Sequence, residues 1–502
     1  MKRIISLVCA LLMLLLSLSA CVQSGNGDDT TIPPAADTTL GVSAESTEAP
    51  VTDGLPQDLS YHGESVVIVS RDYDYLKDEI SVDEDDGDVL HSAISRRNSA
   101  MEERLDIKLV SEKISGDQYA VTKALQAAVS TSEHRYDIIA NSCYSTIMYT
   151  AEGILRNLTD LEHLDLSQPY WSQGFNDAAS IGNAQYMCTG AASLALYRLM
   201  FVTFFNRDLL ETYKEKSLFD VVNDGQWTLD YQIRLGKDYY SDNDANNAVS
   251  DGDTVGLITA TLAYIDPYWS SCKNPILTKD ADNWYVYSVD VDRLATTLRK
   301  VTSLFYDASS YVINSGGDTA RHDAISKYFA SDKALTATIR LCASENEYLR
   351  DMTSKYGVIP MPKLDENQTD YYTFLHDQFT AFGICTPVDD ARAEMLGAVL
   401  EYMAWASSQI VVPVYYNVAL KSKYMQDSAS WDMLDKIYDG IYIDAGVIYT
   451  KSLNSVHQMP RTIVTGQVDN TASRFKSMTK PVTMALEKLQ SDIRKLQEKQ
   501  AG

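Results

Sequence analysis

Buried strands and amphipathic helices alternate in the first part of this chain. Residues 63–69, 107–110 and 136–140 are short apolar runs typical of buried strands. Between them lie two segments, 89–105 and 118–129, whose apolar residues recur at helical spacing. Because a strand–helix–strand order needs a crossover connection, consecutive strands of this kind run parallel. The sequence therefore predicts an α/β fold built on a parallel sheet.

The remainder of the chain contains further elements of both kinds and no fixed-period repeat. We predict extended runs at 199–205, 255–262, 334–341 and 356–359, and helices at 291–305, 391–408, 430–439 and 482–498. The chain has 502 residues, which is too long for one ordinary hydrophobic core. Two α/β lobes are therefore expected.

The amino terminus has the layout of a secretory signal peptide. Two basic residues precede an apolar run over residues 4–20, and small residues stand directly before Cys21. The end of this run resembles the bacterial lipobox, which implies cleavage before Cys21 and acylation of that cysteine. Residues 21–60 are rich in small and polar residues, so we expect them to form a flexible tether. An ordinary signal peptide with a chance cysteine is the alternative.

The chain is strongly acidic. Asp and Glu number 69 against 43 Lys and Arg, a formal net charge of -26. Such a protein is repelled by nucleic acid and by anionic lipid headgroups. We therefore expect no nucleic-acid partner, an extracytoplasmic location, and membrane attachment through lipid on Cys21.

Catalytic signatures are missing from the sequence. No HExxH or GxSxG motif or glycine-rich phosphate loop occurs, and a dispersed histidine such as His376 is more typical of a structural role. No cofactor is required by these patterns, and we predict that the protein is not an enzyme. Five further cysteines lack CxxC spacing, as expected of buried small hydrophobes: Cys143, Cys188, Cys272, Cys342 and Cys385.

The clearest local motif is an acidic loop over residues 242–253. Oxygen-bearing side chains stand at its first, third, fifth and twelfth positions, which are Asp242, Asp244, Asn246 and Asp253. This spacing matches a calcium-binding loop, with Asn247 replacing the usual glycine at position six. We predict a structural Ca²⁺ site here, and a solvated acidic turn is the alternative.

Ligand contacts are expected at strand ends, where open α/β sheets bind their ligands. Aromatic side chains suit sugar rings, and polar ones suit hydroxyl groups. The candidates chosen on this basis are Asn141, Tyr144, Tyr268, Trp269, Arg340, Tyr371 and Tyr372.

Several segments together resemble the extracellular solute-binding proteins of ABC transporters, in the large group with sugar ligands. Their order and spacing carry the resemblance, which covers most of the chain beyond the tether. The segments are 97–98 with 102–107, then 136–139, 205–210, 227–230, 356–363, and 413–416 with 420–424.

The resemblance implies a periplasmic-binding-protein fold of type II, with two α/β lobes joined by a hinge that the chain crosses several times. Crossings are expected near 201–205, 359–363 and 410–413, each as an extended stretch. The first lobe would comprise residues 61–202 and 360–410. The second would comprise residues 203–359 and 411–502.

The same resemblance implies a monomeric lipoprotein that captures a carbohydrate, an oligosaccharide by analogy with the best-known relatives, and delivers it to the permease subunits of an ABC importer. Two alternatives stay open from the sequence. One is a cell-surface glycan-degrading enzyme, which needs two carboxylates at fixed separation. The other is a ligand-sensing module for a receptor kinase.

Overall fold

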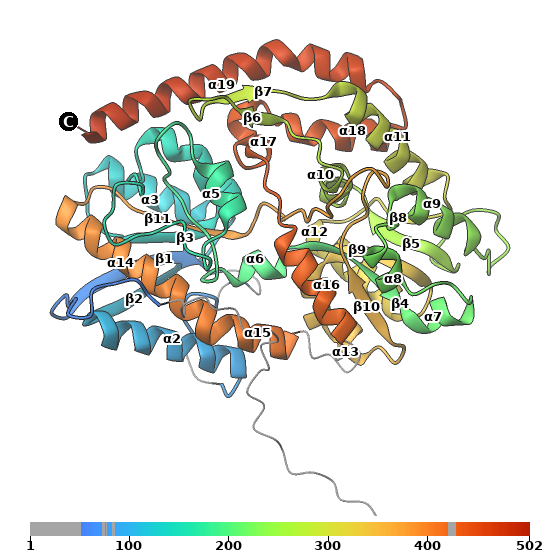
Figure 1. Ribbon diagram of the computed structural model, residues 1–502, viewed down its shortest axis with the longest axis horizontal. Helices are drawn as coiled ribbons and strands as arrows, with labels where there is room; N and C mark the ends of the chain where they lie inside the picture. Colours follow the sequence, from blue (N-terminus) through green and yellow to red (C-terminus); the bar gives the residue numbers. More distant parts are fainter. Residues whose placement is uncertain (1–51, 73–75, 77, 83–85, 420–427, 502) are drawn as a thin grey trace, which may run out of the picture. The chain divides into compact units, whose positions relative to one another are not determined.

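The computed structural model describes residues 52–501, apart from 73–75, 77, 83–85 and 420–427. Cys21 and the predicted signal peptide, and most of the predicted tether, therefore lie outside the described residues. From Thr52 onward the chain forms one compact unit. It contains two main sheets, each with helices packed against it (Figure 1).

The first sheet has the strand order β11-β3-β1-β2. Strands β1 and β2 pair in parallel, β1 and β3 also pair in parallel, and β11 runs antiparallel to β3. The predicted parallel sheet is therefore confirmed, with one antiparallel edge strand added. Its strands are β1 (Glu64–Arg71), β2 (Ile107–Ile114), β3 (Ile138–Ser142) and β11 (Thr380–Ile384).

Both faces of this sheet are covered, because alternate strand residues enter different cores. Ile138 and Ala140 join a cluster with helix α14 (Asp390–Ala406), whereas Ile139 joins one with α3 (Ala120–Ser130). Helix α2 (Val89–Leu105) packs against α14 and spans the predicted range. This arrangement is the buried parallel layer that the apolar runs predicted.

The second sheet has the order β10-β4-β9-β5-β8. Strand β5 lies parallel to both β8 and β9, whereas β4 lies antiparallel to β9 and β10. These strands are β4 (Phe201–Asn206), β5 (Val255–Ala260), β8 (Tyr311–Ile313), β9 (Ala334–Arg340) and β10 (Tyr356–Ile359). The helices around it include α7 (Arg207–Thr212), α8 (Leu218–Asn223), α9 (Leu229–Asp238), α10 (Asp266–Ser271), α11 (Val291–Tyr306), α12 (Asp318–Ala330) and α13 (Glu347–Asp351). We call the layers around the first and second sheets the first and second lobes; their exact boundaries along the chain stay a prediction.

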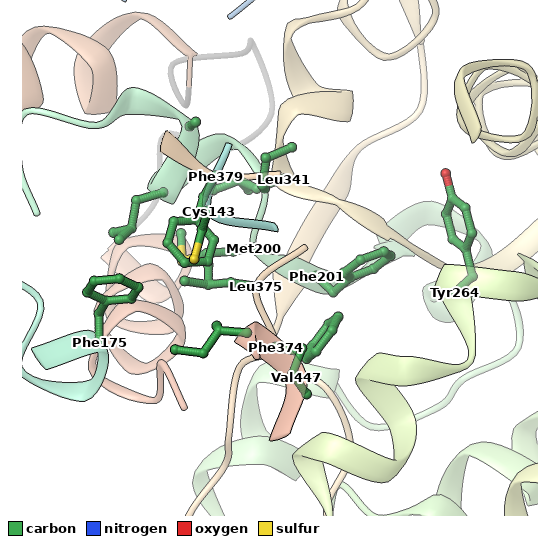
Figure 2. Packing of buried hydrophobic residues seen from close by; sticks show 14 of the residues in the cluster. Cys143, Phe175, Met200, Phe201, Tyr264, Leu341, Phe374, Leu375, Phe379 and Val447 are labelled. Atoms are coloured by element: carbon green, nitrogen blue, oxygen red, sulfur yellow. The ribbon is translucent and has the colours of Figure 1, made fainter. Parts of the chain in front are cut away.

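The chain first passes between the lobes through short helices. It leaves β3 through α4 (Cys143–Thr146), α5 (Gln173–Ala179) and α6 (Leu194–Arg198) to reach β4, and it returns from β10 to β11. Apolar residues on these passages form a continuous core that includes Phe175, Phe201 and Phe379 (Figure 2). Phe175 meets Phe379 edge to face with ring centroids 5.6 Å apart.

The crossing expected as an extended stretch at 410–413 is instead helical, so that prediction was wrong. Helix α14 continues through a π-helical turn (Ser407–Val411) into α15 (Val412–Ala419). The resemblance implied an extended stretch there, but the helix runs on through the π-helical turn, shortly after which Pro413 lies. The stretch Asp390–Asn417 is long and apolar enough to span a membrane, yet 72% of its most apolar window is buried inside the protein, as in a core helix.

The last part of the chain lies against both lobes. Helix α19 (Thr471–Ala501) starts earlier than the predicted residue 482 and packs on α11 and on the hairpin of β6 (Leu277–Lys279) and β7 (Tyr285–Tyr287). Near its end, Gln500 Nε2 donates to the carbonyl of Leu155 at 3.1 Å. Figure 1 shows α19 running along the top of both lobes. The remaining helices are α16 (Ser428–Asp439), α17 (Ala445–Ile448) and α18 (Met459–Gly466).

Candidate functional site

A cavity of about 290 Å³ lies where the carboxyl ends of the parallel strands of the two sheets face each other. Arg340 is the last residue of β9, and Asp318 opens helix α12 after β8. From the other side, Gln378 accepts hydrogen bonds from Arg71 at the end of β1 and from Ser142 at the end of β3. This edge is where open α/β sheets bind ligands. The lining residues are Leu76, Leu199, Asp318, Thr319, His322, Asp323, Arg340, Cys342, Glu345, Asn346, His376 and Gln378.

Two ion pairs hold charged groups in the cavity wall. Arg340 Nη1 donates to Asp318 Oδ2 at 2.7 Å, and Arg340 is only 4% exposed. Desolvation opposes ionisation of Asp318, but the Arg340 guanidinium outweighs it, so the pKa of Asp318 is lowered. Glu345 is held by Arg198 at 2.9 Å and accepts the hydroxyl of Tyr415 at 2.9 Å.

Two histidines in the wall are neutral. Burial and then the nearby Arg340 lower the pKa of His322 to about 3. Burial likewise lowers the pKa of His376, although Asp377 opposes this. Neither Nδ1 has a hydrogen-bond partner among the described residues. A neutral imidazole offers one donor and one acceptor, which matches the two-way hydrogen bonding of a hydroxyl group.

Arg340 is the one predicted ligand residue that lines this cavity. Asn141 lies in the core, where its Nδ2 is within 3.2 Å of hydroxyl oxygens on Thr122, Ser145 and Thr146. Tyr144 is half-buried after β3, with Lys451 5.1 Å from its ring centroid. The structure therefore separates these strand-end residues.

Tyr268 and Trp269 are core residues. Tyr268 has no exposed surface, its hydroxyl bonds to Thr338 at 2.6 Å, and its ring meets Phe305 edge to face. Trp269 is 2% exposed and donates to Asp266 at 3.4 Å. Pro267 stands in the first turn of helix α10 rather than in a loop, so both rings turn inward. This packing leaves neither ring face open to a ligand.

Tyr371 and Tyr372 line a different, more open pocket of about 440 Å³. The Tyr371 hydroxyl accepts from the backbone of Trp227 and donates to that of Val222, both at 3.2 Å. Lys273 lies 4.3 Å from the Tyr372 ring centroid, a cation–π contact. The seven predicted residues thus do not form one site.

Sequence reasoning missed most of the cavity wall, including Asp318, His322 and Gln378. One signal was present: the polar and glycine residues 314–317 follow the apolar run 311–313 and precede Asp318, as at a strand-to-helix turn. His376, for which a structural role was favoured, lies in the wall. The five later cysteines are buried, as expected, and none of them forms a disulfide.

The acidic loop brings three of its four predicted metal ligands together. Oxygens of Asp242, Asp244 and Asp253 all lie within 4.8 Å of one another. Asn246 lies beside them, with its Nδ2 donating to Asp244 at 2.8 Å. Asn247 adopts the left-handed conformation at φ 58°, as position six of a calcium loop requires. Asp253 is buried and accepts backbone N–H bonds from Asn243 and Ser250.

Comparison with known proteins identifies the fold. No family model matches the sequence, and no curated protein matches it. The galacto-N-biose-/lacto-N-biose I-binding protein of the ABC transporter from Bifidobacterium longum, in complex with lacto-N-biose, matches with a TM-score of 0.56 and 11% identity, covering 85% of this chain and 98% of that one. The chain has the fold of ABC-transporter solute-binding proteins.

Two other solved structures with this solute-binding-protein fold match equally broadly. A sugar transporter from Rhizobium etli in an open conformation has a TM-score of 0.55 and 12% identity, covering 83% of this chain and 99% of that one. Maltose-bound MalE3 from T. maritima has a TM-score of 0.52 and 12% identity, covering 85% and 100%. The predicted two-lobed α/β fold of type II is confirmed, and the resemblance on which it rested holds at the level of the fold.

Proposed function

We propose that this protein is the lipid-anchored solute-binding component of an ABC importer and captures a carbohydrate between its two lobes. The observation that carries the proposal is the cavity at the carboxyl ends of the strands in both sheets. Its wall combines the Arg340–Asp318 pair with two neutral imidazoles, His322 and His376. Such a wall can bind hydroxyl groups as donors and as acceptors.

Binding at this place couples capture to the lobes themselves. His322 and Arg340 belong to the second lobe, whereas Gln378 is tied to the strand ends of the first. A solute that contacts the residues of both lobes favours the conformation in which the lobes are closed around it. A permease can distinguish this closed conformation from an open one. A volume of about 290 Å³ lies at the lower end of small-molecule sites and favours one or two sugar rings over a longer chain.

The N-terminal features fit the same role. Lipid on Cys21 would hold the monomeric protein at the membrane beside its permease. The lipid is needed because the negative charge of the protein gives it no attraction to anionic headgroups. The role is capture without turnover, so the glycan should leave the protein chemically unchanged.

A binding screen tests the proposal. Thermal shift with mono- and disaccharides should find at least one ligand, whose Kd is then measured by calorimetry. Arg340→Met should lower the affinity for that ligand at least about tenfold, because it removes the guanidinium from the wall and leaves Asp318 without its ion-pair partner. Arg299→Met is the matched control, since Arg299 pairs with Asp469 on the surface.

Three results would count against this function. They are no binding by any sugar, equal affinity in the Arg340→Met and Arg299→Met variants, and hydrolysis of a bound glycan. A ligand that binds while deletion of the gene leaves its uptake intact would favour the sensing role instead.

We also propose a structural Ca²⁺ in the loop of residues 242–253. Three carboxylates converge there, and no ion pair to any of them is found in the described part of the chain. Like charges this close repel unless a cation or protons compensate them. Asp242, Asp244 and Asp253 would hold the ion, and carboxylate oxygens are the ligands that Ca²⁺ prefers.

A further inference from the structure

The charged groups in the cavity wall are unequally matched. Among the described lining residues, three carboxylates stand against one permanent cation, Arg340. That cation is already engaged by Asp318 at 2.7 Å. Both histidines are neutral, so neither adds positive charge. An anionic solute therefore meets a wall whose one guanidinium is already bound to a carboxylate.

Asp323 is the one carboxylate of the described wall residues without a cationic partner. Glu345 is paired with Arg198 and accepts a hydrogen bond from the Tyr415 hydroxyl. Asp323 lies in the second turn of helix α12, is exposed to solvent, and forms no ion pair with any described residue. Its charge is thus available to a solute that enters the cavity.

The field of the whole protein adds in the same direction. The chain carries a formal net charge of -26, which enriches cations and depletes anions near its surface. A carboxylated sugar that displaced Asp318 from Arg340 would leave that carboxylate unpaired beside Asp323 and Glu345. Like charges in one site disfavour ionisation of both, which makes such binding costly.

We propose that this cavity ranks sugars by charge, taking an amine-bearing sugar before its neutral parent and rejecting the corresponding uronic acid. The ranking rests on the proposed sugar-binding function. Asp323 supplies the preference for the amine, because an ammonium group near it gains an ion pair that a hydroxyl does not. The Arg340–Asp318 pair supplies the rejection of the acid.

Matched sugar sets test this ranking. Calorimetry would compare 2-amino sugar, neutral sugar and uronate in the gluco and galacto series, as monosaccharides and as disaccharides. The amine should bind about three- to fivefold tighter than the neutral sugar, the size of effect expected of one solvent-exposed ion pair. One molar salt should reduce this ratio, because it shortens the screening length to about 3 Å.

Two variants complete the test. Asp323→Asn should abolish the preference for the amine, so that the ratio of amine to neutral-sugar affinity falls to about one. Asp351→Asn, at an exposed acid of helix α13 outside the wall, should keep the preference. Uronates that bind as tightly as amines, or an unchanged ratio in Asp323→Asn, would overturn the ranking while sugar binding stands. Failure of every sugar to bind would overturn both the ranking and the proposed function.

Discussion

The carboxylate of Glu401 accepts a hydrogen bond from the indole nitrogen of Trp171 at 3.0 Å inside the core of the first lobe. The hydroxyl of Tyr170 and the backbone N–H of Asp165 also donate to it. Burial raises the pKa of Glu401 to about 7, although these donors oppose the shift. Helix α14 thus carries a carboxyl group that titrates near neutrality.

Replacing this group should change how stability depends on pH. Because the pKa in the folded protein exceeds the ordinary carboxyl value of 4.5, the contribution of Glu401 to stability is complete below about pH 4.5 and is lost as pH rises through about 7. The amide of Glu401→Gln offers an acceptor oxygen and a donor, as the protonated acid does, but cannot ionise. Between pH 4.5 and 8, wild type should lose about 3 kcal/mol of unfolding free energy relative to the variant.

Urea denaturation at several pH values measures this difference. Subtracting the two profiles removes every other titrating group that the proteins share. Parallel profiles for wild type and Glu401→Gln would show that Glu401 ionises normally in the folded protein.

A second prediction concerns the close approach of β5 to α9. A Cβ atom at Gly256 would lie 2.4 Å from the Cα of Gly236 and 2.7 Å from the carbonyl oxygen of Leu235. Both contacts are backbone, so relief requires moving the helix off the sheet. Gly256→Ala should cost at least about 2 kcal/mol. Gly466→Ala, which meets no atom within 4 Å, should be neutral or slightly stabilising, and equal melting temperatures for the two variants would contradict the packing.

The membrane attachment can be separated from binding. Cys21→Ser should move the protein from the membrane to the soluble fraction without changing its Kd, because the residue precedes the predicted tether and the compact unit begins only at Thr52. Cys9→Ser lies within the apolar run and should leave attachment intact. Fractionation and mass spectrometry would measure both, and a Cys21→Ser protein that stays in the membrane would exclude the lipid anchor.

The sequence predicted the elements of this fold well where local pattern decides them. Helix 89–105 was found to the residue because Asp88 caps its first turn and Asp106 ends it in the left-handed conformation. The edge strand β11 was missed, since residues 380–384 contain Gly383 and follow no helix signal. Its partner β3 lies more than two hundred residues away, and no local pattern records such a pairing.

The site was harder to predict than the fold. Its wall joins residues 76 and 378, near the first sheet, to residues 318–346, near the second, so its members share no sequence window. Arg340 was predictable because it ends a strand. Tyr268 also follows a strand, but the helix that starts at Asp266 turns its ring inward, and only tertiary packing determines that.

Calcium binding at residues 242–253 should appear as a change in melting temperature. A ligand at one hundred times its Kd stabilises a protein by about 2.7 kcal/mol, which corresponds to a few degrees in a unit of this size. A chelator should therefore lower the transition of the wild type by about 2–5 °C, and added Ca²⁺ should restore it. Asp244→Asn removes one converging carboxylate and should abolish this response, whereas Asp251→Asn, in the same loop but outside the cluster, should retain it. If the loop is only a solvated acidic turn, the chelator will leave wild type unchanged, and Asp244→Asn will raise rather than lower the transition because it relieves repulsion with Asp242 and Asp253.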